Sequence, residues 1–434
     1  MRTKTGVTWL PALLLAAGII APSPALEAQE QPTGQRGGRG ESLFKPQDVQ
    51  LGDPETGYVC IEFSPDMKYM AWVEPQGRGR NAENTVWLCA MDADTGDLMP
   101  RSGKGFKVGA VKMSDYEPSG QPQWGQDDKG FFAVILDPEG SLVVVRPQPQ
   151  PDGGLSATVT RLPTPPNPSR MFPYPTRLKK PGGFVVYIQN DSDGNRQLHY
   201  IDLADPTSEH PITHGPHLKI GKKRLEPFIV DIPRWFYDVE TRADGLPLVI
   251  YGDDTQPNPQ IPFPVIEVKE LDFAEPKPMP ATVAKPLPVL FDPFPFLHRG
   301  ERYIIAGVNA KASGVVVKPG VDGQYRDVIH RFEPRGSGLK NPNNLASAEP
   351  FVWRGKVYSA FQVNEPGAPG TTSAEIWLTS VLDGSVLRRI SADDPSQRAD
   401  PEFFIGKNRV WIFYFAHASN SGRWQLRRAD TGLQ

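Results

Sequence analysis

The sequence has only two cysteines and no run of basic residues. Cys60 and Cys89 fall on the first and third strands of one predicted three-stranded unit. The strand between them separates their Cα atoms by about twice the usual spacing of roughly 4.8 Å, which is further than the roughly 7 Å that a disulfide allows. We therefore expect two buried thiols. The 47 Lys and Arg against 50 Asp and Glu give a net charge of −3, which argues against nucleic acid as the main partner.

Long apolar runs are absent except near the N-terminus. Arg2 and Lys4 precede an apolar stretch over residues 7–21, and small residues follow at Ala25 and Ala28. This is the pattern of a secretory signal peptide cleaved after one of the two alanines. The stretch is too short for a spanning helix of about 20 residues; an uncleaved anchor is the alternative. We expect a periplasmic or secreted protein without stable membrane insertion after cleavage.

Proline and glycine are abundant, at 47 and 41 of 434 residues, and they are scattered along the chain. Long helices cannot form at that spacing, whereas short strands with many turns can. The predicted organisation is a signal peptide over residues 1–28, a flexible tail over 29–42 and one domain over 43–434. The tail has no large apolar side chain to bury. A closed ring of repeats can use all the remaining residues in a single domain.

Residues 58–96 form the unit that the rest of the chain repeats. It contains three β-rich runs, of which the first two are joined by Ser64-Pro-Asp66 and the third ends in Asp94-Thr-Gly96. Variants recur about every 50 to 65 residues, as in elaborated propeller blades. We predict an all-β, seven-bladed β-propeller, with six blades as the alternative. Because the last copy lacks a fourth strand, we expect residues 42–49 to close the ring.

The first unit resembles the TolB-like, or WD40-like PD40, propeller repeat. The resemblance rests on Phe63-Ser-Pro-Asp66, on Tyr69-Met-Ala-Trp72-Val73 and on Val86-Trp87-Leu before the closing turn; the second unit has Trp124-Gly-Gln-Asp127 at the first of these places. TolB carries an additional N-terminal α/β domain, and prolyl-oligopeptidase-type enzymes add a hydrolase domain to a similar propeller. Neither domain has a counterpart here, and no Gly-x-Ser-x-Gly nucleophile motif occurs.

Carboxylates recur beside proline where first strands are expected to begin. Glu349 and Asp400, together with Asp231 before the fourth unit, are candidate catalytic residues, because glycoside cleavage needs two carboxylates at a set separation. Ala348-Glu-Pro-Phe351 and Ala399-Asp-Pro-Glu402 resemble the strand entrances of five-bladed propeller glycosidases. The structural alternative is that a residue before proline is held extended, which suits any strand entrance.

Aromatic and basic residues supply the candidate ligand-binding set, because they can stack on a sugar or peptide. They are Tyr174, Arg234, Trp235 and Tyr237. A core position between blades is the alternative for Trp235.

Three histidines, His210, His214 and His217, have a spacing that can hold a metal. A solvated loop between blades is the preferred explanation. We expect no metal and no cofactor.

Two classes of function stay open. The first is an exported TolB-like propeller that binds a protein or glycan through its funnel, the face where the first strands begin, without catalysis. The absence of a nucleophile motif and the scarcity of histidine favour it. The second is a carbohydrate-active enzyme, a glycoside hydrolase or polysaccharide lyase, that uses the acidic residues at the strand entrances of the funnel.

Overall fold

The computed structural model describes a set of ranges that excludes the N-terminus and much of the chain between residues 212 and 289. The described residues form no helix, and therefore none that is sufficiently long and apolar to cross a membrane. The described ranges are 46–76, 84–112, 119–151, 154–175, 183–193, 196–211, 219–220, 223–224, 248–253, 267–272, 279–283, 290–308, 312–321, 325–340, 342, 344–365, 374–394, 396–417 and 423–433.

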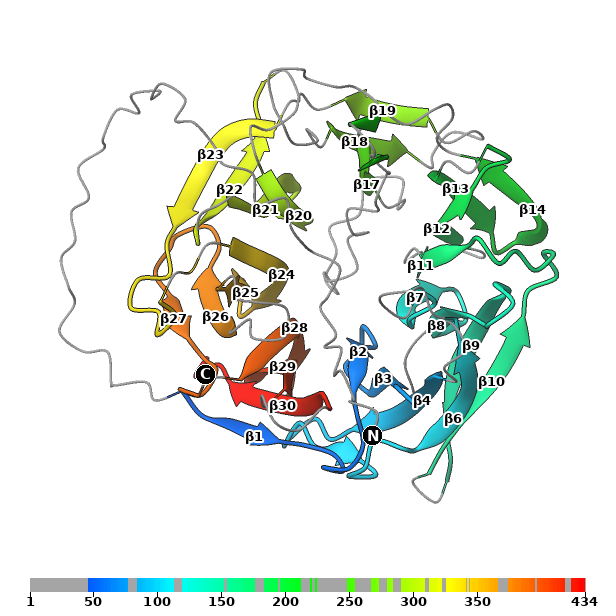
Figure 1. The fold of residues 1–434 in the computed structure, drawn as a ribbon, viewed down its shortest axis with the longest axis horizontal. Helices are drawn as coiled ribbons and strands as arrows, with labels where there is room; N and C mark the ends of the chain where they lie inside the picture. Colours follow the sequence, from blue (N-terminus) through cyan, green and yellow to red (C-terminus); the bar gives the residue numbers. More distant parts are fainter. Residues whose placement is uncertain are drawn as a thin grey trace, which may run out of the picture.

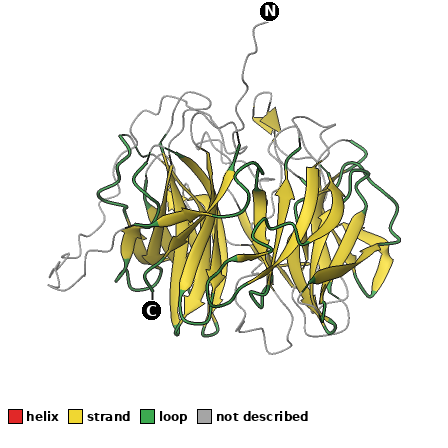
Figure 2. Cartoon of the chain, turned by 90° about the horizontal axis from the view of Figure 1, so that it is seen from below, coloured by secondary structure: helices red, strands yellow, loops and turns green. Residues whose placement is uncertain are grey.

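Small antiparallel sheets stand side by side in a ring, and each follows the previous one along the chain (Figure 1). Seen from the side, their strands run roughly along the ring axis (Figure 2). The innermost strands are β2 (Val59–Phe63), β7 (Gln123–Asp127), β11 (Met171–Pro175), β20 (Leu290–His298), β24 (Asn344–Trp353) and β28 (Gln397–Ile405).

The second and third strands of these sheets lie further out, in chain order. They are β3 (Tyr69–Glu74) and β4 (Asn84–Met91), β8 (Gly130–Leu136) and β9 (Leu142–Pro149), β12 (Phe184–Asn190) and β13 (Arg196–Asp202), β21 (Glu301–Val308) and β22 (Gly314–Pro319), β25 (Lys356–Asn364) and β26 (Ala374–Ser380), and β29 (Val410–His417) and β30 (Gln425–Asp430).

The outer strands complete the sheets. They are β5 (Leu98–Met99) and β6 (Phe106–Val111), which both pair with β4, and β10 (Leu155–Arg161), β14 (Asp205–Pro211), β23 (Tyr325–Phe332), β27 (Leu387–Arg389) and β1 (Asp48–Gln50). Between β14 and β20 the chain forms a hairpin, β15 (Lys219–Ile220) and β16 (Lys223–Arg224), and the sheet of β17 (Leu248–Asp253), β18 (Glu267–Asp272) and β19 (Met279–Val283). The predicted all-β class is thus confirmed.

Aromatic side chains hold neighbouring sheets face to face. Phe63 on β2 meets Phe404 on β28 and Phe413 on β29, with ring centroids 5.3 and 4.8 Å apart. Phe351 on β24 meets Phe403 on β28 at 5.3 Å. Because each sheet is covered on both faces, strands such as β29 are buried along nearly their whole length and read as continuous apolar runs.

The N-terminal strand β1 joins the sheet made by the C-terminal strands. It pairs antiparallel with β30, with Asp48 opposite Ala429 and Gln50 opposite Arg427. The first half of the predicted strand, residues 42–45, lies outside the described residues. Of the two cysteines, Cys89 on β4 is buried, and Cys60 on β2 is half-buried rather than buried as expected.

A β-bulge recurs in the inner strands. In β24, Ala346 lies opposite Gln362 and Glu349 opposite Ala360, so three steps along β24 match two along β25. The same shift occurs in β2, β11, β20 and β28. In four of the five bulges, one residue adopts a left-handed backbone conformation, with φ of 51°, 52°, 48° and 57° at Cys60, Phe172, Ser347 and Asp400. Bulges re-aim side chains and are frequent beside functional sites.

Candidate functional site

The first paired residue after each bulge occupies an equivalent position on its inner strand. Gln123 on β7 belongs to the same set, because it lies four residues before the last pair of its hairpin, Asp127 with Gly130, just as Glu349 lies four residues before Trp353, which pairs with Lys356. We call this set the inner belt. In ring order it consists of Phe294, Glu349, Glu402, Glu62, Gln123 and Tyr174.

The inner belt has an acidic arc on three successive sheets. Glu349, Glu402 and Glu62 come from β24, β28 and β2, and these strands contact one another in that order. An amide, Gln123, and a half-buried aromatic, Tyr174, continue the belt on β7 and β11. The inner belt therefore combines three carboxylates with aromatic side chains at equivalent positions, and these are the groups that carbohydrate sites use.

The polar members of the inner belt are buried. Glu62 is 6% exposed, Gln123 1%, Glu349 3% and Glu402 5%. Gln123 Nε2 donates to Glu62 Oε1 at 2.7 Å across the gap between two sheets. Trp124 Nε1 donates to the Glu62 backbone oxygen at 3.0 Å. Neighbouring belt residues can thus come within hydrogen-bonding reach of each other.

Two of the residues proposed from the sequence fall on the inner belt: Glu349 and Tyr174. Asp400 lies two residues before the belt position, at the left-handed residue of the β28 bulge. Glu349 and Asp400 are therefore not equivalent, since Glu349 corresponds to Glu402 and Asp400 corresponds to Ser347.

The other residues proposed from the sequence fall mainly outside the described residues. These are Asp231, Arg234, Trp235, Tyr237, His214 and His217. His210 lies on β14 and stacks on Tyr200, with ring centroids 4.8 Å apart. In the described part of the chain, no group of three or more His, Cys, Asp or Glu side chains is placed to hold a metal.

The sequence led us to expect the acid–proline pairs directly before the inner strands, and two of them are not there. Glu349-Pro350 and Asp400-Pro401 both lie within strands, because β24 begins at Asn344 and β28 at Gln397. Pro401 lies in the bulge, where the regular pairing of β28 with β29 is interrupted. Its missing N–H therefore costs no cross-strand hydrogen bond. The expectation of carboxylates at the strand entrances is corrected to carboxylates within the strands.

Glu62 and Glu402 were missed from the sequence because neither precedes a proline. Both are followed by phenylalanine, in Glu62-Phe63 and Glu402-Phe403. They lie at different distances from their hairpin turns, however, since Glu62 is one residue and Glu402 three residues before the last paired residue of its strand, so an alignment of the repeats on their turns does not bring them together.

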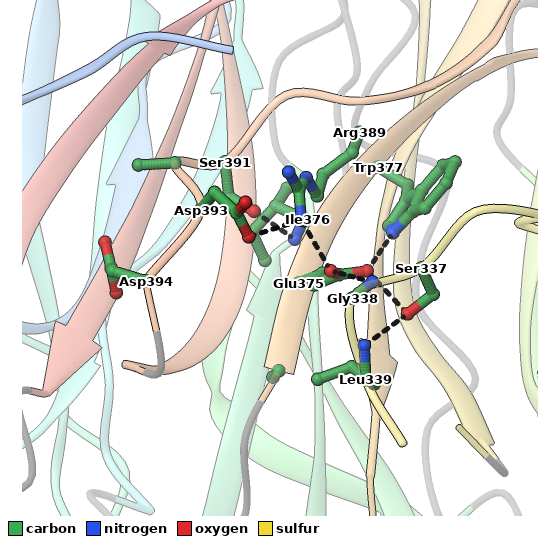
Figure 3. A network of polar contacts seen from close by, with 12 residues as sticks. Ser337, Gly338, Leu339, Glu375, Ile376, Trp377, Arg389, Ser391, Asp393 and Asp394 are labelled. Atoms are coloured by element: carbon green, nitrogen blue, oxygen red, sulfur yellow. Dashed lines mark hydrogen bonds and ion pairs between the residues drawn. The ribbon is translucent and has the colours of Figure 1, made fainter. Parts of the chain in front are cut away.

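Another buried carboxylate, Glu375 at the start of β26, has a different setting (Figure 3). It accepts hydrogen bonds from Ser337 Oγ and Gly338 N at 2.8 Å, and from Trp377 Nε1 and Arg389 Nη1 at 2.9 Å. Burial by itself would raise the pKa of Glu375, but these donors outweigh it and hold the pKa below its usual value. A carboxylate held ionised in this way ties the segment before β24 to β26 and β27.

The chain matches no protein-family model and no curated protein. Among solved structures it is similar to an ulvan lyase of polysaccharide lyase family PL25 bound to a GlcA–Rha3S unit (11% identity over 88% of this chain and 95% of that chain, TM-score 0.49). It is also similar to Trypanosoma rangeli sialidase (10% identity over 88% of this chain, TM-score 0.41) and to a protein of unknown function from Dyadobacter fermentans (11% identity over 89% of this chain and 98% of that chain, TM-score 0.45). The chain spans 58% of the sialidase. Two of these neighbours are carbohydrate-active enzymes, but at these scores the likeness carries no argument about the activity of this chain.

Proposed function

We propose that the chain is an exported, seven-bladed propeller of the TolB-like class, closed by β1, and that its inner belt cleaves glycosidic bonds. The observation that carries the proposal is the acidic arc, in which equivalent positions on successive inner strands hold Glu349, Glu402 and Glu62. Among the two classes left open by the sequence, this geometry supports the carbohydrate-active one better.

Glu349 and Glu402 are the pair that we assign to the reaction, because their strands, β24 and β28, are in contact. In hydrolysis one of them, protonated, gives its proton to the leaving glycosidic oxygen. The other, ionised, takes a proton from the water that attacks the anomeric carbon, so that the net change is the addition of one water molecule. Tyr174 and Phe294, at either end of the polar arc, offer aromatic faces for the sugar.

A binding function without catalysis is the second candidate. The observation that favours it is burial, since all four polar belt residues are at most 6% exposed. Such burial restricts access for a bulky polymer. A belt of this kind would hold a small ligand or simply stabilise the ring.

The test is a screen of the purified protein against plant and bacterial polysaccharides, with detection of new reducing ends and of unsaturated products. Turnover should vanish in Glu349→Gln and in Glu402→Gln, because an amide keeps the shape of the side chain but cannot exchange the proton. The matched control is Glu333→Gln, whose side chain is 64% exposed. Turnover that survives both belt substitutions would exclude the assignment, and binding without any product would favour the second candidate.

A further inference from the structure

Two sheets each place an arginine, a tyrosine and a carboxylate at equivalent positions. In the sheet β11–β14, the Tyr187 hydroxyl donates to Glu209 Oε1 at 2.8 Å, and Arg170 Nε donates to the same oxygen at 2.8 Å. Burial and then the Glu209 carboxylate raise the pKa of Tyr187, and Arg170 opposes the rise. The three side chains thus form a brace that ties the residue directly before β11 to the second and outer strands of the sheet.

The second brace lies in the sheet that contains both ends of the described chain. The Tyr414 hydroxyl donates to Asp48 Oδ2. Burial and then Asp48 raise the pKa of Tyr414 well above its usual value, and Arg398 opposes the rise. Arg427 Nη1 lies 3.5 Å from Asp48 Oδ1, and the Ala392 amide donates to Asp48 Oδ2 at 3.3 Å.

The two braces occupy equivalent positions. Arg170 and Arg398 each directly precede the last paired residue before the bulge, which is Met171 in β11 and Ala399 in β28. Tyr187 and Tyr414 each directly precede the cross-strand partner of that residue, which is Ile188 or Phe415. On the third strands, Tyr187 lies opposite His199 and Tyr414 lies opposite Arg427. Two residues further along these strands are Ile201 and Ala429. These lie opposite the two carboxylates, Glu209 on β14 and Asp48 on β1. Strand β1 therefore takes in its sheet the place that β14 takes in the other.

The difference between the braces is how the outer strand is attached. Strand β1 is only three residues long, and Val49 on it is 47% exposed. The Asp48 side chain, in contrast, is 5% exposed and contacts β29, β30 and the segment before β28. Removing one partner of a buried ion pair strongly destabilises a protein, because the other charge is left buried without compensation. Asp48 is thus the side chain on β1 that distinguishes a bound strand from an unbound one.

We propose that the outer edge of β30 is a strand-binding slot that selects a carboxylate. Its occupant is the chain's own segment 46–51, recognised through Tyr414, Arg427 and Asp48, and continued by the bond from the Leu51 amide to the Leu426 oxygen at 2.9 Å. An extended segment gains main-chain pairing from any sheet edge, and the side-chain pocket supplies the selection. With Asp48 absent, the slot is open to an acidic strand supplied in trans.

The test compares full-length Asp48→Ala with the wild type by hydrogen exchange. The amides of residues 48–51 should exchange at least about tenfold faster in the variant, while those of β11–β14 stay unchanged. Val49→Thr, a change at the exposed neighbour on the same strand, should have no effect. If Asp48→Ala does not fold, Tyr414→Phe removes one hydroxyl from the same contact and should give a smaller rise. Equal protection of residues 48–51 in the wild type and in the variant that folds would overturn the proposal.

The selection itself is tested with a labelled peptide of sequence PQDVQL, residues 46–51. It should bind Asp48→Ala and leave the wild type, whose slot is filled, unlabelled. A peptide with asparagine in place of the aspartate should bind at least about tenfold more weakly. Equal binding of the two peptides, or binding of neither, would show that the slot does not select a carboxylate.

Discussion

Buried carboxylates in this chain differ in what surrounds them, and the difference separates a structural role from a chemical one. Glu375 accepts four hydrogen bonds, including one from Arg389, and is thereby held in its ionised form. Glu62 shares its carboxylate with an amide, Gln123. General acid–base chemistry needs a group that can change protonation, and Glu375, held ionised by its donors, is therefore assigned a structural role.

Replacing Glu375 with glutamine should reduce the free energy of unfolding by about 3 kcal/mol at pH 7, because Arg389 loses its buried partner. The pKa of Glu375 is lowered in the folded state, so its contribution is fully present above the usual value of about 4.3. It is lost as the pH falls through the lower, folded value. Urea unfolding of both proteins at pH 7 and at pH 3 should show the gap between them shrinking at pH 3. A gap of the same size at both pH values would contradict the charge-based explanation.

Cys89 should be inert towards thiol reagents in the folded protein. Burial raises its pKa to about 12, and the thiolate is the reactive form, so that at pH 8 only about one thiol in ten thousand is ionised. Mass spectrometry after alkylation should find Cys89 unmodified in buffer and modified in denaturant. Alkylation of Cys89 in buffer at the rate seen in denaturant would show that β4 opens readily.

At the scale of the strand, the repeated apolar runs allowed the inner strands to be located from the sequence, but not their starts. Glu349-Pro350 was expected to stand where a first strand begins, whereas β24 begins at Asn344. Proline was interpreted as marking a strand entrance because the residue before it is held extended. In the structure Pro173, Pro293 and Pro401 all fall within the bulges, where a donor is not required.

The inner belt was only partly predictable for the same reason. Glu349 and Tyr174 were proposed from the sequence, but their equivalence depends on the bulge, and the bulge depends on the backbone of several strands together. No local pattern marks it, because the left-handed residue is Cys60, Phe172, Ser347 or Asp400 in different strands. The equivalence became visible only from the cross-strand pairing.

The bulge makes a prediction at Ser347, where φ is 48°. A left-handed conformation costs a residue with a Cβ about 1 kcal/mol and costs glycine almost nothing. Ser347→Gly should therefore be more stable than Ser347→Ala by about 1 kcal/mol, as measured by chemical unfolding. At the neighbouring Ala346, which has no left-handed backbone, glycine should instead lower stability by about 0.5–1 kcal/mol. Ser347→Gly less stable than Ser347→Ala would mean that the bulge does not hold this conformation in solution.

At the scale of the whole molecule, the last sheet is locked to the first by polar contacts as well as by the aromatic ones. Arg428 on β30 reaches Asp97 at 2.8 Å and donates to the Thr95 oxygen at 2.5 Å. The Lys407 amide donates to the Ala93 oxygen at 2.9 Å. The turn after β4 thus fits against the sheet that carries both ends of the described chain.

Arg428→Ala should lower the free energy of unfolding by about 1–2 kcal/mol, because the Arg428 side chain is only 15% exposed and two hydrogen bonds are lost. Arg409→Ala is the matched control. Its ion pair with Asp430 lies between side chains that are 52% and 40% exposed, and such pairs contribute little. Thermal unfolding measures the stability of both variants. Equal losses of stability in the two would show that the Arg428 contacts between the first and last sheets do not stabilise the protein.

Strands β1 and β30 are the first and last strands of the described chain, yet they are neighbours in one sheet. On a ribosome, β1 emerges long before the edge that it pairs with has been made. At about 5–20 residues per second, the delay amounts to tens of seconds. Until the last residues of β30 have been made, β1 has no strand to pair with, and the sheet that contains both strands cannot be completed.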